Sequence, residues 1–337
     1  AEAWTGPKVG PGEEARRVTG LADVRSVEAL EGDLEPLLTG NGREGPGGSD
    51  TVFVSLGNAR NHLRWGSLLA SRLATEPLEP LLSGLRLIKD EDEIRRLRRA
   101  VEITSEAHRE LWRVAEPGLR EYQLEAALEY VFKASGAERL GFPSIVGSGP
   151  NSVILHYDTN RRALEVGEMV VVDIGAEFGY YTADLTRTFP ASGRFSERQS
   201  ALYNLVLGTR QAALDVIHPG STMREVNEAA RGFLQTQSGD LCGATSCAPF
   251  LAHGVSHWLG MDVHDVGSSR TPFVPGMVLT LEPGLYLPEE GIGIRIEDDI
   301  LVTAGGCEVL SENLPREPDE IEEIMREDPR WVRLNLE

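Results

Sequence analysis

Two aspartates stand where predicted β-strands end and begin. Asp173 ends a run of three valines, and Asp184 follows a second β-rich run after a glycine-containing turn. Such a pattern predicts a β-hairpin. A hairpin centred on Phe178 and Gly179 would place the two aspartates directly opposite each other, with Cβ atoms about 4.5–5.5 Å apart. Two carboxylates repel at that distance, so the pattern indicates bound metal ions, whereas the alternative is a solvated hairpin with two unrelated aspartates.

A similar arrangement of acids recurs later in the chain. Glu282 ends the strand-like segment 277–282, and Glu297 lies in the apolar return segment 293–303. In both halves a glycine stands six positions before the first acid. A carboxylate within an apolar strand is costly unless it is paired, so these glutamates are also candidate ligands.

Three of the seven histidines fall within thirteen residues, at positions His253, His257 and His264. A lone histidine is usually a structural residue, but three together beside glycines are poorly explained in that way. Neutral imidazole is a common metal ligand and an acid or base near neutral pH. The nearby Asp262 and Asp265 are candidates to orient these rings.

Four carboxylates and one imidazole therefore form a candidate ligand set: Asp173, Asp184, His257, Glu282 and Glu297. Their four negative charges balance two divalent cations. Oxygen-rich ligation with one nitrogen favours Mn²⁺ and leaves Co²⁺, Zn²⁺ and Fe²⁺ open. Two ions about 3.5–4 Å apart suit hydrolysis through a bridging hydroxide.

The elements that must position these residues form a faint internal repeat. The order helix, helix, β-hairpin occurs twice, over about residues 88–190 and 197–303. The first helix begins at a capping box of Asp90 and Glu93. The other helices are predicted at about 122–134, 197–217 and 223–235. The pattern predicts an α+β fold in which two pseudo-symmetric halves bring the four carboxylates together.

Residues 1–85 differ from the rest and predict a small α/β piece. They contain a predicted strand at 51–56, a predicted helix at 61–74 and a loop-like composition at 39–49. We place a domain boundary near residues 85–89, so the second domain covers residues 86–337.

Composition excludes several classes of partner. The 337 residues carry a net charge of −20, which argues against nucleic acid and against an anionic membrane surface. No apolar run approaches the roughly 18 residues of a membrane span. With three cysteines, no disulfide framework is expected; Cys242 and Cys247 are interpreted as ordinary thiols, which fits a reducing cytoplasm.

Four segments, in this order, resemble metal-site signatures of the pita-bread metallopeptidases: DIGAEFGYYTADLTRTFP, HGVSHWLGMDVHD, LTLEPGLY and GIGIRIEDDI. The second and fourth most resemble the Xaa-Pro aminopeptidase branch, with Xaa-Pro dipeptidases as near relatives. The resemblance covers about residues 86–303. It implies a pita-bread catalytic domain over 86–337, preceded by a short or partial creatinase-like domain over 1–85.

The resemblance also implies roles for the candidate ligands. Asp173 would bind one metal ion, and His257 with Glu282 would bind the other. Asp184 and Glu297 would bridge both ions. Glu282 would in addition help to activate the bridging hydroxide and to shuttle protons.

Further residues match family positions near the scissile bond. The segment FPSIVGSGPNSVILHY places one family histidine at His156, and His253 and His264 match two others. These histidines would bind substrate and stabilise the tetrahedral intermediate. Arg295 matches an active-site arginine near the substrate.

The expected function is release of the N-terminal residue from peptides with proline in second position. Its partners would be proline-containing peptides, and a cytoplasmic homodimer is expected. The alternatives are an Xaa-Pro dipeptidase, a non-catalytic binding protein on the same fold, and a metal-free amidinohydrolase of the creatinase kind. The complete ligand set argues against the last two.

Overall fold

The computed structural model describes residues 9–30, 32–33, 51–55, 74–243 and 245–334. The chain divides into two compact units, Ala1–Leu82 and Ser83–Glu337. Among the described residues no helix is both long and apolar enough to cross a lipid bilayer.

The first unit contains few described elements. They are α2 (Glu13–Thr19), the 3-10 turn η1 (Val27–Ala29), and strands β1 (Thr51–Val54) and β2 (Ala74–Pro77), which pair in parallel. Strand β1 confirms most of the strand predicted at 51–56. The predicted loop 39–49 and all but the last residue of the predicted helix 61–74 lie outside the described residues. Helix α5 (Glu79–Leu87) spans the boundary between the units.

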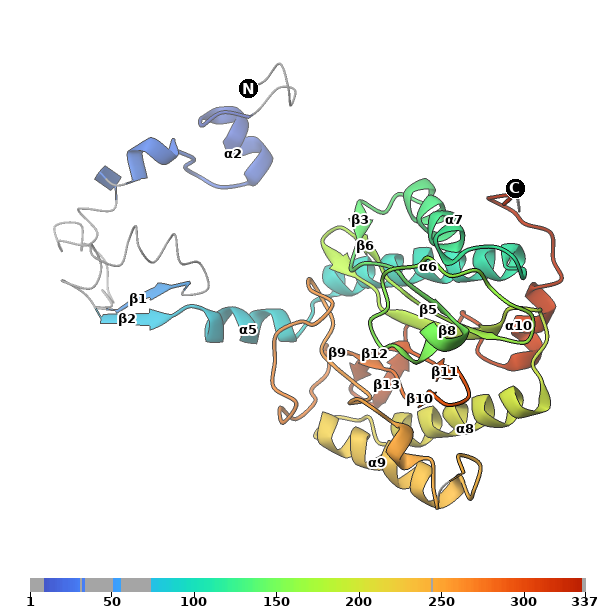
Figure 1. The fold of residues 1–337 in the computed structure, drawn as a ribbon. Coiled ribbons are helices and arrows are strands. Elements are labelled where there is room, and N and C mark those ends of the chain that lie inside the picture. The colour runs from blue at the N-terminus through green and yellow to red at the C-terminus, as the bar shows by residue number, and fades with distance from the viewer. Residues whose placement is uncertain (1–8, 31, 34–50, 56–73, 244, 335–337) are drawn as a thin grey trace. The chain divides into compact units, whose positions relative to one another are not determined.

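The second unit is built on two helix pairs, α6 (Glu91–Val114) with α7 (Glu121–Ala134), and α8 (Glu197–Leu214) with α9 (Met223–Gln237). Figure 1 shows most strands of this unit lying between the two pairs. The predicted capping box is confirmed, because the Asp90 carboxylate accepts the Glu93 N–H at 2.9 Å and the Glu93 carboxylate accepts the Asp90 N–H at 2.7 Å. Each helix pair covers one half of the repeat.

Small antiparallel sheets fill the space between the helix pairs, in the orders β4-β5-β8, β13-β12-β9, β3-β6-β7 and β10-β11. The strands are β3 (Arg139–Leu140), β4 (Ile145–Ser148), β5 (Met169–Ile174), β6 (Ala176–Phe178), β7 (Tyr181–Thr182), β8 (Leu185–Pro190), β9 (Val278–Leu281), β10 (Gly284–Leu287), β11 (Ile292–Arg295), β12 (Asp298–Thr303) and β13 (Gly306–Val309). A short helix, α10 (Pro318–Ile324), follows. The pairs β5–β8 and β9–β12 each follow a helix pair, so the predicted repeat and its α+β class are confirmed.

The predicted register of the first hairpin is wrong by two residues. Asp173 pairs with Thr186, not with Asp184. The chain turns at Gly179 and Tyr180, which have φ values of 58° and 71°, one position later than the predicted centre. A shift of two preserves the face of the strand, so Asp184 becomes a diagonal neighbour of Asp173. The two carboxylates therefore still converge.

The core of the second unit makes these strands a rigid frame. Every residue of β5 and β8 is buried, and α6 contributes buried side chains such as Leu111 and Trp112. Each fully buried Val, Leu or Ile side chain contributes roughly 1.5–3 kcal/mol. The acids at the ends of these strands are consequently held by a packed core.

Cys242 and Cys247 form a disulfide, which corrects the expectation that both are ordinary thiols. After α9 ends, the chain turns through Gly239 and Gly243, both with positive φ, and brings the two Cα atoms within 5.3 Å. That distance permits a disulfide. Three cysteines give one pair and a free Cys307, so their odd number does not exclude a bridge.

The disulfide gives a first testable prediction. Unreduced, denatured protein is expected to show one free thiol per chain, that of Cys307, and three after reduction. Closing so short a loop contributes about 2 kcal/mol to the free energy of unfolding. A thiol titration in denaturant checks the count, and three free thiols before reduction would show that the bridge is absent.

Candidate active site

The predicted site residues all line one cavity of about 520 Å³ in the second unit. They are His156, Asp173, Asp184, His253, His257, His264, Glu282, Arg295 and Glu297. An apolar wall completes the cavity, formed by Phe142, Pro143, Ile145, Leu155 and Val263. Charged groups that lie far apart in sequence thus face a common space beside a hydrophobic surface.

The four acids are placed by buried strands and by backbone hydrogen bonds. Asp173 lies within β5 and Asp184 just before β8, while Glu282 follows β9 and Glu297 precedes β12. The Glu297 N–H donates to the Thr186 carbonyl at 3.0 Å. This bond connects the two halves of the repeat directly behind the acids.

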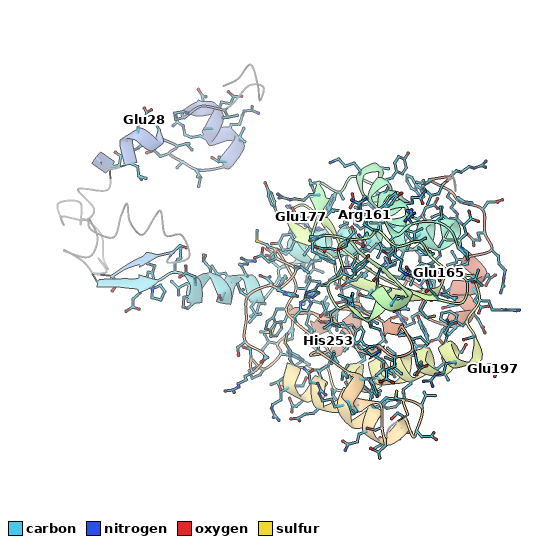
Figure 2. All side chains as sticks on the ribbon, viewed as in Figure 1. Glu28, Arg161, Glu165, Glu177, Glu197 and His253 are labelled. Atoms are coloured by element: carbon cyan, nitrogen blue, oxygen red, sulfur yellow. A yellow bond between two sulfur atoms is a disulfide. The ribbon has the colours of Figure 1, made fainter. Side chains whose placement is uncertain are left out.

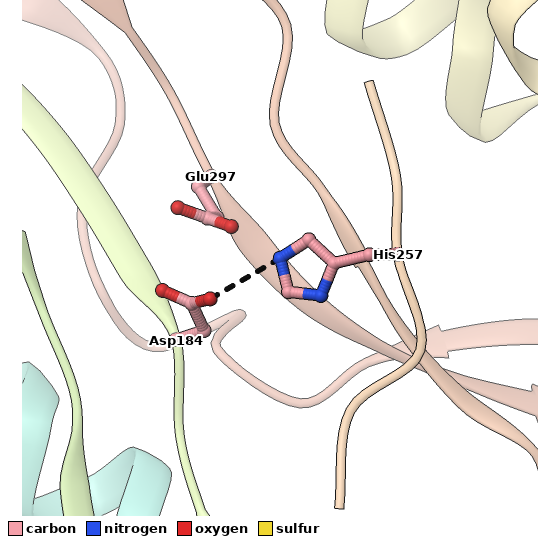
Figure 3. Close-up of side chains that lie close together, drawn as sticks. All are labelled: Asp184, His257 and Glu297. Carbon is pink, nitrogen blue, oxygen red and sulfur yellow. Dashed lines mark ion pairs between the residues drawn. The ribbon is translucent and has the colours of Figure 1, made fainter. Parts of the chain in front are cut away.

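His257 enters the acidic cluster from the coil between α9 and β9. Ligand atoms of Asp184, His257 and Glu297 all lie within 4.8 Å of one another (Figure 3). His257 Nε2 is 3.3 Å from Asp184 Oδ2 and 3.6 Å from Glu282 Oε1. Its Nδ1 is 3.1 Å from the Trp258 carbonyl. A proton on Nδ1 leaves the Nε2 lone pair facing the carboxylates, which is the orientation a metal ligand needs.

Arg295 also lines the cavity and hydrogen-bonds to one of the acids and to a neighbouring threonine. Its Nη2 donates to Asp173 Oδ2 at 2.6 Å and its Nε donates to Thr186 Oγ1 at 3.0 Å. Thr186 Oγ1 in turn donates to Glu297 Oε2 at 2.6 Å. One guanidinium therefore orients a carboxylate from each half of the repeat.

The cluster carries more negative charge than the protein alone neutralises. Burial, followed by repulsion from Asp173, raises the pKa of Asp184 well above its ordinary value. Burial, followed by repulsion from Asp184, also raises the pKa of Glu297 well above its ordinary value. Burial raises the pKa of Glu282 to about 7. These carboxyl groups therefore lose their protons less readily than exposed carboxyls do.

The residues present fit a divalent metal site. Asp173 Oδ1 and Asp184 Oδ1 are buried and have no hydrogen-bond partner among the described residues. Buried carboxylate oxygens are ordinarily satisfied, and hard divalent cations prefer this oxygen-rich donor set. Bound cations would both satisfy the oxygens and replace the protons.

Comparison with known proteins identifies the family. The family model described as metallopeptidase family M24 matches residues 95–304, which contain every candidate site residue. The chain belongs to metallopeptidase family M24. Membership implies divalent metal ions, in agreement with the fit of the donor set.

The M24 relatives include Xaa-Pro aminopeptidases. That of Escherichia coli (strain K12) is 37% identical, with 96% of this chain and 79% of the relative covered. Xaa-Pro aminopeptidase 3 of Rattus norvegicus is 33% identical, with 96% and 67% covered. Among solved structures, Pseudomonas aeruginosa aminopeptidase PepP has a TM-score of 0.85 at 36% identity, covering 96% of this chain and 79% of that one. An Escherichia coli aminopeptidase P variant in complex with substrate has a TM-score of 0.83 at 35% identity, covering 96% and 80%.

The other three cavity histidines of this M24 chain, apart from His257, differ in their surroundings. His253, labelled in Figure 2, has Nδ1 2.7 Å from the Gly254 carbonyl and Nε2 2.8 Å from the Tyr286 hydroxyl. Burial lowers the pKa of His253 to about 4, so this ring is neutral. His156 and His264 are exposed, and among the described residues their ring nitrogens have no hydrogen-bond partner. They are free to meet a ligand.

Two residues of the site are not singled out by the sequence patterns. Tyr286 accepts a hydrogen bond from Arg295 Nη1 at 3.0 Å and contacts His253, and Thr186 joins Arg295 to Glu297. A period-2 rule offers one signal, because Thr186 stands two positions after Asp184 and so shares its face of the strand. Tyr286 is four positions after Glu282 and stands in β10, where spacing alone does not predict its partners.

Metal binding is expected to depend on pH. Raised carboxyl pKa values mean that protons compete with cations in acid, since ligands must be deprotonated. Addition of Mn²⁺ to metal-free protein should therefore raise Tm more at pH 8 than at pH 5. Thermal unfolding at both pH values, with NaCl of equal ionic strength as the control, checks this; equal shifts would contradict it.

Proposed function

We propose that this protein is a dinuclear-metal exopeptidase that releases the N-terminal residue from peptides with proline in second position. The observation that carries the proposal is the convergence of four carboxylates and His257 on one cavity that apolar side chains also line. The Xaa-Pro aminopeptidase names of its relatives support the substrate class.

The ligand roles follow the family resemblance. Asp173 would hold one ion, His257 and Glu282 the other, and Asp184 and Glu297 both. When bound, two divalent ions supply a Lewis acid that polarises the scissile carbonyl and lowers the pKa of the attacking water. The oxygen-rich donor set favours Mn²⁺, with Co²⁺, Zn²⁺ and Fe²⁺ as the alternatives.

The chain's own side chains would bind the peptide and move its protons. Glu282 takes a proton from the attacking water and returns it to the leaving proline nitrogen. His264 and His156 donate hydrogen bonds to the substrate as negative charge develops on the carbonyl oxygen. His253 Nδ1 lies 3.6 Å from Glu282 Oε2, so the neutral ring borders that carboxylate.

The apolar wall would receive the proline ring. Phe142, Leu155 and Val263 offer nonpolar surface in the same cavity as the carboxylates. Such burial favours a compact, nonpolar ring over a polar side chain at this position. Arg295 orients Asp173 and Thr186 through its hydrogen bonds. By the family resemblance it is also the fourth residue, with His156, His253 and His264, that would bind the substrate.

A peptide panel assayed with Mn²⁺ tests the proposal. Xaa-Pro-Yaa peptides should lose their first residue, whereas matched Xaa-Ala-Yaa peptides should be cleaved far more slowly. If only the Xaa-Pro dipeptide is cleaved efficiently, the protein is an Xaa-Pro dipeptidase instead. Absence of any cleavage and of metal binding would favour a non-catalytic protein.

Assembly and location are further predictions. We infer a homodimer from the family resemblance, which light scattering on the purified protein would test. Cytoplasmic location is our prediction from the sequence, but the Cys242–Cys247 disulfide is more typical of an oxidising compartment. Fractionation of cells that express the full-length protein would decide between the two.

A further inference from the structure

A buried glutamate outside the cavity holds the loop that carries His156. Glu121 is the first residue of α7 and is fully buried, although acidic residues are rarely buried without partners. Its carboxylate accepts hydrogen bonds from Ser148, Asn151, Tyr157 and Arg162. Charge-assisted bonds of this kind are stronger than neutral ones, so both carboxylate oxygens are fixed.

One oxygen binds the start of the loop. Glu121 Oε1 accepts the Ser148 N–H at 2.8 Å, the Ser148 hydroxyl at 2.7 Å and the Asn151 amide at 3.0 Å. Ser148 is the last residue of β4, and Asn151 lies in the 3-10 turn that follows it. The carboxylate thus fixes the point where the chain leaves the sheet.

The other oxygen binds the end of the same loop. Glu121 Oε2 accepts the Tyr157 hydroxyl at 2.8 Å and the Arg162 N–H at 2.8 Å. The Glu121 N–H also donates to the Arg162 carbonyl at 2.9 Å. This end of the loop can be located in Figure 2 at the labelled Arg161. His156 therefore lies between two stretches that are fastened to one carboxylate.

Side chains also take the place of a neighbouring strand along β4. One edge of β4 pairs with β5. At the other edge the Val146 N–H donates to Asn160 Oδ1 at 3.0 Å and the Ser148 N–H donates to Glu121. The network consequently fixes the end of the strand from which the loop starts.

We propose that Glu121 is a positioning residue that places His156 for its contact with the peptide. The exposed His156 ring has no hydrogen-bond partner of its own among the described residues, so its place depends on the backbone of the loop. Glu121 supplies the connections across the base of that loop. The inference rests on the proposed function, because His156 acts only on a bound peptide.

The test is a double-mutant cycle with Glu121→Gln and His156→Ala. Glutamine presents an N–H₂ group to donors that need an acceptor, so the loop should shift. We expect kcat/KM for an Xaa-Pro-Yaa peptide to fall about 10- to 100-fold, mainly through kcat. In the His156→Ala background the same substitution should change kcat/KM less than about 2-fold, because coupled residues are not additive.

Glu110→Gln is the matched control. Glu110 is also a buried carboxylate and accepts the backbone N–H groups of Arg330, Trp331 and Val332, but it does not line the cavity. It should lower Tm and leave kcat/KM unchanged. If Glu121→Gln behaves in the same way, or if its effect and that of His156→Ala multiply, the proposal is wrong.

Tyr157→Phe keeps the test decisive if Glu121→Gln does not fold. It removes one hydrogen bond to Glu121 and should lower kcat/KM about 3- to 10-fold, again only when His156 is present. Hydrogen exchange gives a readout independent of catalysis, because the Ser148 and Arg162 amides should exchange faster in Glu121→Gln. Unchanged exchange would overturn the positioning role, whereas a wild-type protein inactive on every Xaa-Pro peptide would overturn the proposed function instead.

Discussion

Replacing Asp184 with asparagine is expected to lower kcat/KM toward an Xaa-Pro-Yaa peptide by roughly 10³-fold or more. That loss corresponds to the several kcal/mol that a bound metal contributes to transition-state stabilisation. Asp184 Oδ2 lies 3.3 Å from His257 Nε2, and a carboxylate oxygen of Asp184 lies within 4.8 Å of one of Glu297, so its replacement should disturb both proposed metal positions. Steady-state kinetics with added Mn²⁺, together with metal analysis, checks the result.

The same substitution should not destabilise the metal-free protein. Burial, then Asp173 and Asp299, raises the pKa of the Asp184 carboxyl above its ordinary value. A carboxyl whose pKa is higher in the folded state weakens folding as pH rises through the unfolded value, about 3.9. Asparagine removes that penalty, so the metal-free variant should have a higher Tm than wild type at pH 8, and a smaller difference at pH 4. A lower Tm at pH 8 would indicate a structural role instead.

Asp298→Asn, in contrast, should lower the Tm of the protein, although Asp298 is the direct neighbour of the proposed ligand Glu297. Burial acts to raise its pKa, but Arg187 and Arg210 outweigh burial and hold the pKa of Asp298 below its usual range. The side chain is fully buried, 2.7 Å from Arg187 Nη2 and 2.5 Å from Arg210 Nε. Removing one partner of a buried ion pair costs about 3–5 kcal/mol. Tm is therefore expected to fall by roughly 10 °C.

Asp92→Asn controls for the loss of an ion pair in itself. Asp92 pairs with Arg95 at 2.6 Å, and its side chain is 53% exposed. Exposed pairs contribute little, so its Tm should remain close to that of wild type. Thermal unfolding of the three proteins gives the comparison, and an Asp298→Asn protein as stable as the Asp92→Asn protein would contradict the account.

The site could be predicted from sequence because its chemistry is concentrated in short segments. Asp184 and Glu297 each stand next to a buried strand, and a carboxylate in such a place needs a cation or a partner. The repeated order of helices and strands then indicated that the acids meet. What this pattern could not give was the register, because Tyr180 adopts a positive φ at the turn, a conformation that a tyrosine rarely takes.

Long-range contacts account for the other omissions. The sequence around Glu121 indicates only an acidic residue in the first turn of a helix. Its hydrogen-bond partners lie 27 to 41 residues further along the chain. Tyr286 gives no local signal of its bonds to Arg295 and His253. The Cys242–Cys247 bridge depends on a turn whose path is set by the glycines around it. In each case the decisive fact is which segments meet, which periodicity does not encode.

Titration of metal-free protein with Mn²⁺, following both bound metal and the cleavage of an Xaa-Pro-Yaa peptide, tests the central claim most directly. If the four carboxylates and His257 hold a dinuclear catalytic site, two ions should bind per chain in the wild type, cleavage should rise with their binding, and Asp184→Asn should lose both. Full cleavage by protein kept free of divalent ions with a chelator would contradict it.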